Sequence, residues 1–176
     1  MFHRDVDEQI RLQLAMPFHA DQLFELTDRN RDFLRPWLGW IDATRGPDDS
    51  RTFLSIQLDR FGKGQALTTM IYFDGLLVGV AGYHSIDQAN RVGCLGYWLD
   101  QGHTGNGIMT RVVQDLVNAG RECYSLGRIE IRCSTENERS RSVAQRLGFM
   151  HRGTCRHAEK VGDVWHDHDV YVHENV

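Results

Sequence analysis

The segment spanning residues 96–110 restricts the fold of this chain more than any other. It reads Gly-Tyr-Trp-Leu-Asp-Gln-Gly-His-Thr-Gly-Asn-Gly-Ile-Met-Thr, so an aromatic strand runs into a glycine-rich loop. Ile108, Val112 and Leu116 then recur at helical spacing. A strand, loop and helix in this order point free backbone N–H groups outward at a helix N-terminus, where a phosphate binds well.

Residues 102–107, the glycine loop, match neither of the common phosphate-binding motifs. The sequence has no G-x-x-x-x-G-K-[ST], and the glycine spacing is not G-x-G-x-x-G. Because the loop has no lysine, backbone amides and the helix dipole would supply most phosphate contacts. Asn106 and Thr110 can add side-chain hydrogen bonds. The alternative interpretation is a plain start of a helix, with glycines for tight turning.

The remaining pattern predicts an α+β fold built on one mixed sheet. Asp74-Gly75 between two apolar runs predicts a β-hairpin, which a further strand ending near Leu99 extends into an antiparallel meander. Alternating or helical periodicity predicts the other elements. Strands are expected at residues 9–15, 66–73, 76–85, 129–133, 150–158 and 167–172, and helices at 20–38, 48–62, 108–123 and 137–147.

Composition bounds the class of protein. A chain of 176 residues with 41% apolar and 25% charged residues suits a single domain, here residues 1–176. No apolar run approaches the roughly 20 residues that cross a membrane, and no signal-peptide pattern opens the chain. The four cysteines lack C-x-x-C pairing, which favours reduced thiols in a cytoplasm. The net charge of −4 argues against nucleic acid and mildly for a cationic substrate.

A second motif lies at residues 137–149, Asn-Glu-Arg-Ser-Arg-Ser-Val-Ala-Gln-Arg-Leu-Gly-Phe. By itself it predicts a short helix, with Asn137 as N-cap and Gly148 as the stop. Together with the earlier glycine loop, N-x-x-S-x-x-V-A-x-x-L-G-F resembles the GNAT superfamily of acetyl-CoA-dependent N-acetyltransferases. The Pro36-Trp37-Leu38 element, the Gly96-Tyr97-Trp98 strand and the late Trp165-His166-Asp167 run resemble its RimJ/RimL branch.

The resemblance implies a GNAT-like α+β fold: a central mixed, mostly antiparallel seven-stranded sheet flanked by helices and splayed between its fourth and fifth strands. It implies acetyl-CoA as co-substrate and no metal. The strand at residues 97–99 would pair with the pantetheine arm, and the glycine loop would wrap the diphosphate. The implied cofactor-binding residues are Tyr97, Trp98, Leu99, His103, Thr104, Gly105, Asn106, Gly107, Ile108, Met109, Thr110, Asn137 and Ser140.

The resemblance also implies the catalytic residues. Glu159 would be the general base that deprotonates the amine, and Ser140 would protonate the departing thiolate. His84, or a water held by Asp87, is the alternative base. Without the resemblance, Glu159 is equally well a surface residue at the end of a strand.

An amine acceptor is expected beside an aromatic wall. Trp37, Trp40 and His84 are the expected substrate-binding residues, since aromatic faces attract cations. The acceptor is expected to be a protein N-terminal α-amine. A small amine (polyamine, amino acid or antibiotic) and a non-catalytic acyl-CoA-binding module are the alternatives. Neither nucleic acid nor membrane is an expected partner, and the oligomeric state stays open, with a homodimer among the options.

Three features depart from the pattern or invite another interpretation. The superfamily usually has Gln or Arg where Gly102 stands and often Arg where Thr104 stands, so either the cofactor affinity is modest or other basic residues contact the phosphates. The candidates are Arg111, Arg139 and Arg141. The run of residues 166–169, His-Asp-His-Asp, suggests a metal site, but alternate strand residues point to opposite faces, so we interpret it as strand-edge polarity. Cys94 and Cys133 have apolar neighbours and are expected to be inert.

Overall fold

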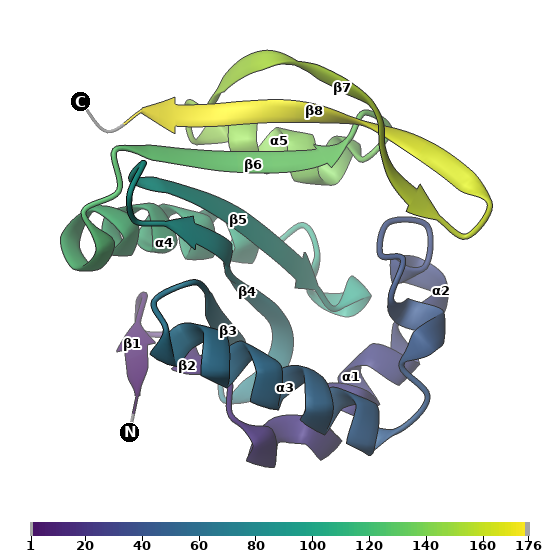
Figure 1. The fold of residues 1–176 in the computed structure, drawn as a ribbon. Coiled ribbons are helices and arrows are strands. Elements are labelled where there is room, and N and C mark those ends of the chain that lie inside the picture. Colours follow the sequence, from purple (N-terminus) through teal and green to yellow (C-terminus); the bar gives the residue numbers. More distant parts are fainter. Residues whose placement is uncertain (1, 175–176) are drawn as a thin grey trace.

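The computed structural model describes residues 2–174 and contains one mixed sheet (Figure 1). Its eight strands follow the order β1-β2-β3-β4-β5-β6-β8-β7. Only β5 and β6 are parallel neighbours. The prediction of seven strands was one short, because the three-residue β1 (His3–Asp5) pairs with β2 (Ile10–Leu14) at the sheet edge. β1 is too short to show alternation, and its Arg4 is fixed by an ion pair to Asp115 at 2.7 Å.

The predicted meander is confirmed as β3 (Leu67–Phe73), β4 (Leu76–Asp87) and β5 (Val92–Leu99). Asp74 and Gly75 have φ values of 48° and 80°, the left-handed pair that a tight two-residue hairpin requires. The next turn is closed by Asp87, whose carboxylate accepts hydrogen bonds from the backbone N–H and side chain of Asn90.

Helices cover both faces of the sheet. α1 (Ala20–Arg29) and α3 (Pro47–Gly62) pack together through a core cluster that includes Leu23 and Leu54, while α4 (Ile108–Tyr124) packs in the larger core with Ile71 and Tyr83. The prediction of one helix over 20–38 was wrong. The chain leaves helical geometry at Asn30 and resumes as α2 (Arg31–Leu34), because the Asn30 side chain bonds across to the glycine-loop region. Single turns of 3₁₀-helix lie at Pro17–His19, Ile41–Ala43 and Gln101–His103.

The C-terminal half contains β6 (Arg128–Ser134), α5 (Glu138–Arg146), β7 (Met150–Val161) and β8 (Val164–Glu174). Asn137 caps α5 by accepting from the Ser140 N–H at 3.1 Å, and Gly148, at φ 74°, ends it, as predicted. β7 and β8 are longer than predicted and enclose Glu159. Their largely exposed, polar residues conceal the alternation on which the sequence-based strand bounds depended.

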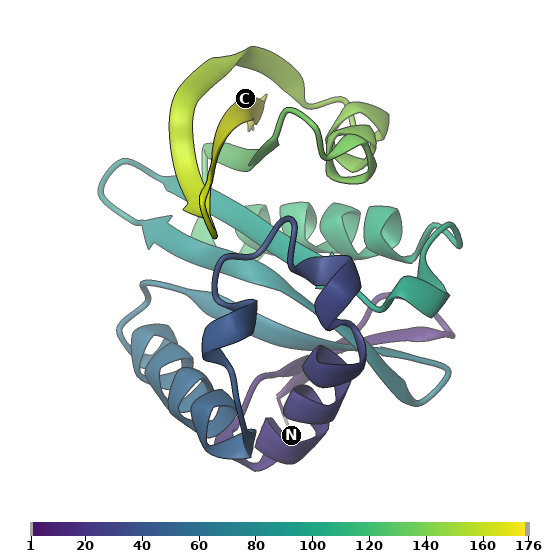
Figure 2. The same cartoon turned by 90° about the vertical axis from the view of Figure 1, so that its right-hand side faces the viewer.

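The predicted divergence of two central strands is confirmed. β5 and β6 pair only from Val92 opposite Arg128 to Leu95 opposite Ile131. Beyond that point Gly96–Leu99 follow β4 alone, and the β7–β8 hairpin curves over toward the segment after α2 (Figure 2). The divergence leaves the edge of β5 available to a ligand. Within residues 2–174 no helix is long and apolar enough to cross a membrane.

Candidate active site

A cavity of about 1190 Å³ occupies the space between the diverging strands. It extends from the N-terminus of α4, past β5 and the start of α5, to the β7–β8 hairpin. Most residues predicted to bind the cofactor line it. These are Tyr97, Trp98, Leu99, Thr104, Gly105, Gly107, Ile108, Met109, Thr110, Asn137 and Ser140.

The glycine loop forms one end of the cavity. Gly105 and Gly107 have φ values of 85° and 71°, and open space surrounds the position of a β-carbon at each. Gly107 is the N-cap of α4, with no side-chain cap hydrogen bond and no acidic residue in the first turn. The first backbone N–H groups of α4 therefore face the cavity without an intrahelical partner, as an anion site requires.

His103 and Asn106 do not line the cavity. His103 Nδ1 lies 2.6 Å from Asp100 Oδ2, and Asn106 Nδ2 donates to the His103 carbonyl at 3.4 Å. Burial alone would raise the pKa of Asp100, but hydrogen bonds from Asn30 and His103 outweigh it, so this pKa lies below its usual value. The structure thus places both side chains where they fix the shape of the glycine loop.

The basic candidates separate into two groups. Arg111 and Arg139 line the cavity, whereas Arg141 points to Asp169 at 3.1 Å and to the Tyr171 hydroxyl. Arg111 also pairs with Asp7 at 2.7 Å, and Arg139 lies 5.1 Å from the centre of the Phe33 ring.

Sequence reasoning missed Arg146, which lines the cavity and donates to Thr110 Oγ1 at 3.0 Å. The sequence offered a way to find it: Arg146 lies seven positions after Arg139, which places the two arginines on the same face of α5. It brings a positive charge to the N-terminal turn of α4 from a different helix.

Tyr97, Ser140 and Cys133 meet in the middle of the cavity. Ser140 Oγ donates to the Tyr97 hydroxyl at 3.2 Å, and that hydroxyl donates to the Ser140 carbonyl at 3.1 Å. Burial raises the pKa of Tyr97 and of Cys133, so the phenol and the thiol are neutral at pH 7. The neutral thiol agrees with the expectation of an inert cysteine.

Glu159 and His168 face each other at the end of the cavity that lies at the β7–β8 hairpin, away from the glycine loop. Glu159 Oε2 lies 3.4 Å from His168 Nε2, and both side chains line the cavity. Burial, the largest effect on this imidazole, lowers the pKa of His168 and outweighs the opposing effect of the Glu159 carboxylate, while His166 and Arg132 lower it further. The ring is therefore neutral at pH 7, and it can accept or donate a hydrogen bond to the carboxylate.

Sequence reasoning, which interpreted residues 166–169 as strand-edge polarity, also missed that two histidines of this run line the cavity. His166 and His168 lie on one face of β8 and line the cavity, while Asp169 is held on the other face by His151 and Thr154. His166 Nδ1 lies 3.2 Å from Ser134 Oγ. Among residues 2–174, no three His, Cys, Asp or Glu side chains gather as metal ligands would.

The three residues predicted to bind the amine acceptor differ in whether they line the cavity near Glu159. Trp37 lines the cavity, and its ring centre is 6.4 Å from that of His166. The ring of Trp40 packs against Trp98 at 6.3 Å, outside the lining residues. His84 packs over Gly96 on the sheet and is also outside the lining residues. Asp87, the alternative holder of a water, is engaged by Asn90 at its turn.

Comparison with known proteins agrees with this arrangement. The family model of the acetyltransferase (GNAT) domain matches residues 9–150. The chain is 30% identical to the ribosomal-protein-serine acetyltransferase of Escherichia coli over 167 residues, 95% of this chain and 93% of that protein. It is 31% identical to a putative ribosomal N-acetyltransferase of Bacillus subtilis, over 95% of this chain and 92% of that protein.

A solved structure of RimL, a ribosomal α-N-protein acetyltransferase in complex with coenzyme A, superimposes with a TM-score of 0.93 at 26% identity. The match covers 97% of this chain and 96% of RimL. The microcin self-immunity acetyltransferase MccE, solved with acetyl-CoA and AMP, gives a TM-score of 0.92 at 26% identity, over 97% and 93% of the two chains. The chain therefore belongs to the GNAT acetyltransferase family, and within it to the RimJ/RimL type.

Proposed function

We propose that this enzyme transfers the acetyl group of acetyl-CoA to the N-terminal α-amine of a protein, by direct attack in a ternary complex. One observation carries the proposal: a single cavity connects the free amides of α4 to the Glu159–His168 pair, past the unpaired edge of β5. A thioester lying along that edge would bring its carbonyl between the two ends.

The lining residues suit each part of the cofactor. The diphosphate would lie at Gly105, Gly107 and the first turn of α4, with Arg111 and Arg146 beside it. The pantetheine arm would pair with the backbone of residues 97–99, like an added strand. Asn137 lines the cavity there, although its side-chain oxygen already caps α5. Two arginines from helices would thus replace the usual loop side chains missing at Gly102 and Thr104.

The acetyl transfer follows from the groups at the Glu159–His168 end of the cavity. An α-amine has a pKa of about 8 and a lysine amine of about 10.4, so an α-amine is easier to deprotonate near pH 7. The Glu159 carboxylate accepts the proton, directly or through a water. The C–N bond then forms while a β5 backbone N–H near Tyr97 or Trp98 stabilises the oxyanion. The C–S bond breaks, and the Ser140 hydroxyl, hydrogen-bonded to Tyr97, gives its proton to the thiolate while it takes up the second proton that the acylated nitrogen loses.

The four free cysteines support an intracellular, reducing site of action, and we propose the cytoplasm. A small amine is the second candidate acceptor, because MccE, an acetyltransferase of similar fold, was solved with a small molecule, AMP, beside acetyl-CoA. Both candidates use the same cavity and the same carboxylate.

The test combines calorimetric titration with acetyl-CoA and a thiol-release assay. The acceptor panel contains peptides with a free N-terminus, the same peptides with a blocked N-terminus, polyamines and amino acids. Turnover of the free peptides alone supports the proposal. Turnover of small amines alone assigns the second candidate, and acetyl-CoA binding without any turnover assigns a non-catalytic binding module.

A further inference from the structure

Two consecutive residues, Asn30 and Arg31, lie at the junction of α1 and α2 and line no part of the cavity. Asn30 is 3% exposed, and the side chain of Arg31 is 21% exposed. Both make more hydrogen bonds than a helix junction requires, and they make them to different segments.

Asn30 holds the segment that leads into the glycine loop. Its Nδ2 donates to Asp100 Oδ1 at 2.7 Å and to the Leu26 carbonyl at 2.9 Å, and its Oδ1 accepts from the Gln101 N–H at 2.9 Å. Asp100 passes the connection on, because its second oxygen contacts His103 at 2.6 Å. The start of the glycine loop is thus tied to α1 through a buried amide.

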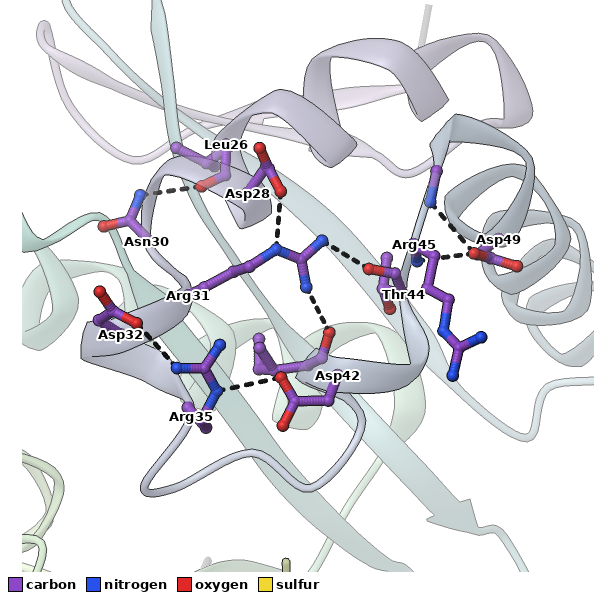
Figure 3. A network of polar contacts seen from close by, with 12 residues as sticks. Leu26, Asp28, Asn30, Arg31, Asp32, Arg35, Asp42, Thr44, Arg45 and Asp49 are labelled. Carbon is purple, nitrogen blue, oxygen red and sulfur yellow. Dashed lines mark hydrogen bonds and ion pairs between the residues drawn. The ribbon is translucent and has the colours of Figure 1, made fainter.

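Arg31 holds a different segment, residues 36–46, which we call the wall loop. Figure 3 shows its guanidinium reaching three acceptors. Nη1 donates to the Ile41 carbonyl at 2.7 Å, Nη2 to the Thr44 carbonyl at 2.6 Å and Nε to Asp28 at 2.6 Å. A planar guanidinium can hold two carbonyls in this way, whereas an ammonium group is a single point charge.

The end of the wall loop is fixed as well. Asp49 accepts from the backbone N–H groups of Arg45 and Gly46, at 2.7 and 3.1 Å (Figure 3). The start of the loop carries Trp37 into the cavity. Gly39 approaches the β7–β8 hairpin, since a β-carbon there would lie 3.4 Å from the Lys160 carbonyl. The wall loop therefore lies beside the strand that carries Glu159, at the end of the cavity proposed for the acceptor.

We propose that Asn30 and Arg31 are positioning residues with separate duties: Asn30 sets the glycine loop for the cofactor, and Arg31 sets the wall loop for the acceptor. Neither touches a substrate. The acceptor duty rests on the proposed function, while the cofactor duty requires only that acetyl-CoA binds. The junction makes both ends of the cavity preformed before either substrate arrives.

The experiment compares Asn30→Ala and Arg31→Lys with wild type. Arg31→Lys keeps the positive charge beside Asp28 but loses the paired hydrogen bonds to the Ile41 and Thr44 carbonyls. We expect it to raise KM for the acceptor peptide about tenfold and to leave the acetyl-CoA Kd within about twofold. Asn30→Ala should show the reverse, with an acetyl-CoA Kd raised about tenfold and little change in acceptor KM. Arg51→Lys, an exposed arginine of α3 paired with exposed Asp21 and Asp48, is the matched control and should change neither.

Amide hydrogen exchange supplies a readout that needs no acceptor. Arg31→Lys should speed exchange in residues 41–46 and leave exchange in residues 100–107 unchanged. Asn30→Ala should speed exchange in residues 100–107 and leave exchange in residues 41–46 unchanged. Should Asn30→Ala fail to fold, Asn30→Ser, which keeps a small polar group, replaces it. The proposal is overturned if each variant changes the acceptor KM and the acetyl-CoA Kd equally and speeds exchange equally in both segments. It is also overturned if neither variant changes any of these quantities. A wild-type enzyme that binds acetyl-CoA but acetylates no amine refutes the proposed function instead, and the exchange pattern then still decides this inference.

Discussion

Glu159 on β7 and His168 on β8 are diagonal neighbours across the hairpin, with Oε2 and Nε2 3.4 Å apart. The register that pairs Glu159 with His166 places all three side chains on one face of the hairpin, toward the cavity. The carboxylate is half-exposed, with 45% of its side chain open to solvent, so an incoming amine or a water can reach it.

Replacing Glu159 by Gln should lower kcat by about a hundredfold or more, because the amide keeps the shape but cannot accept the proton. The acetyl-CoA Kd should stay unchanged, since the diphosphate end of the cavity is untouched. Steady-state kinetics and calorimetry measure the two quantities. Full activity in Glu159→Gln would assign the base elsewhere, with His168 as the next residue to replace.

Ser140→Ala should cost less than Glu159→Gln, about tenfold in kcat or less, because a thiolate leaves well without protonation. Tyr97→Phe tests the same hydroxyl pair from the other side, since Ser140 donates to Tyr97 at 3.2 Å. Single-turnover rates with the same acceptor decide the order. A larger loss for Ser140→Ala than for Glu159→Gln would contradict the assigned roles.

Arg146→Ala should weaken acetyl-CoA binding about fivefold, which corresponds to about 1 kcal/mol, and should make the remaining binding less dependent on salt. The reason is the loss of a cation beside the first turn of α4. Titrations at two ionic strengths measure the effect. Arg152→Ala is the control, because that arginine pairs with Glu174 on the outer hairpin. Equal Kd values for Arg146→Ala and wild type would exclude a role for Arg146 at the phosphates.

Stability should fall as pH drops below about 6.5, the ordinary pKa of histidine. Burial lowers the pKa of His19, His84 and His168 in the folded state. Between the folded and unfolded pKa values the unfolded chain binds more protons, so acidification favours unfolding in that window. Urea unfolding at pH 7.5 and 5.5 tests this, and a variant with Gln at His19, His84 and His168 is the control that should lose the dependence. A wild type as stable at pH 5.5 as at 7.5 would refute the prediction.

The sequence could predict those parts of the fold that local chemistry determines. The hairpin at Asp74-Gly75, the N-cap at Asn137 and the stop at Gly148 each depend on a few adjacent residues, and all are found. The divergence of β5 and β6 came from the family resemblance rather than from periodicity. It is a relation between strands distant in sequence, which no local pattern encodes.

The wrong or missed predictions share one cause, which is a contact between residues distant in sequence. Helix 20–38 breaks because Asn30 bonds to Asp100, 70 positions away. His166 and His168 looked like edge polarity because the strand expected at residues 150–158 stopped short of Glu159, and no local pattern shows that the hairpin brings Glu159 beside them. Arg146 was overlooked because its partner, Thr110, lies on another helix. In each case a long-range contact decided the role of the residue.

Mass spectrometry of acceptor peptides tests the central claim most directly. The enzyme is incubated with acetyl-CoA and two versions of one lysine-containing peptide, with a free and a blocked N-terminus, and the products are fragmented to locate the acetyl group. We predict one acetyl group on the α-amine of the free peptide and none on the blocked one. Acetyl groups on the lysine of both versions, or on neither peptide while polyamines are consumed, would contradict the account.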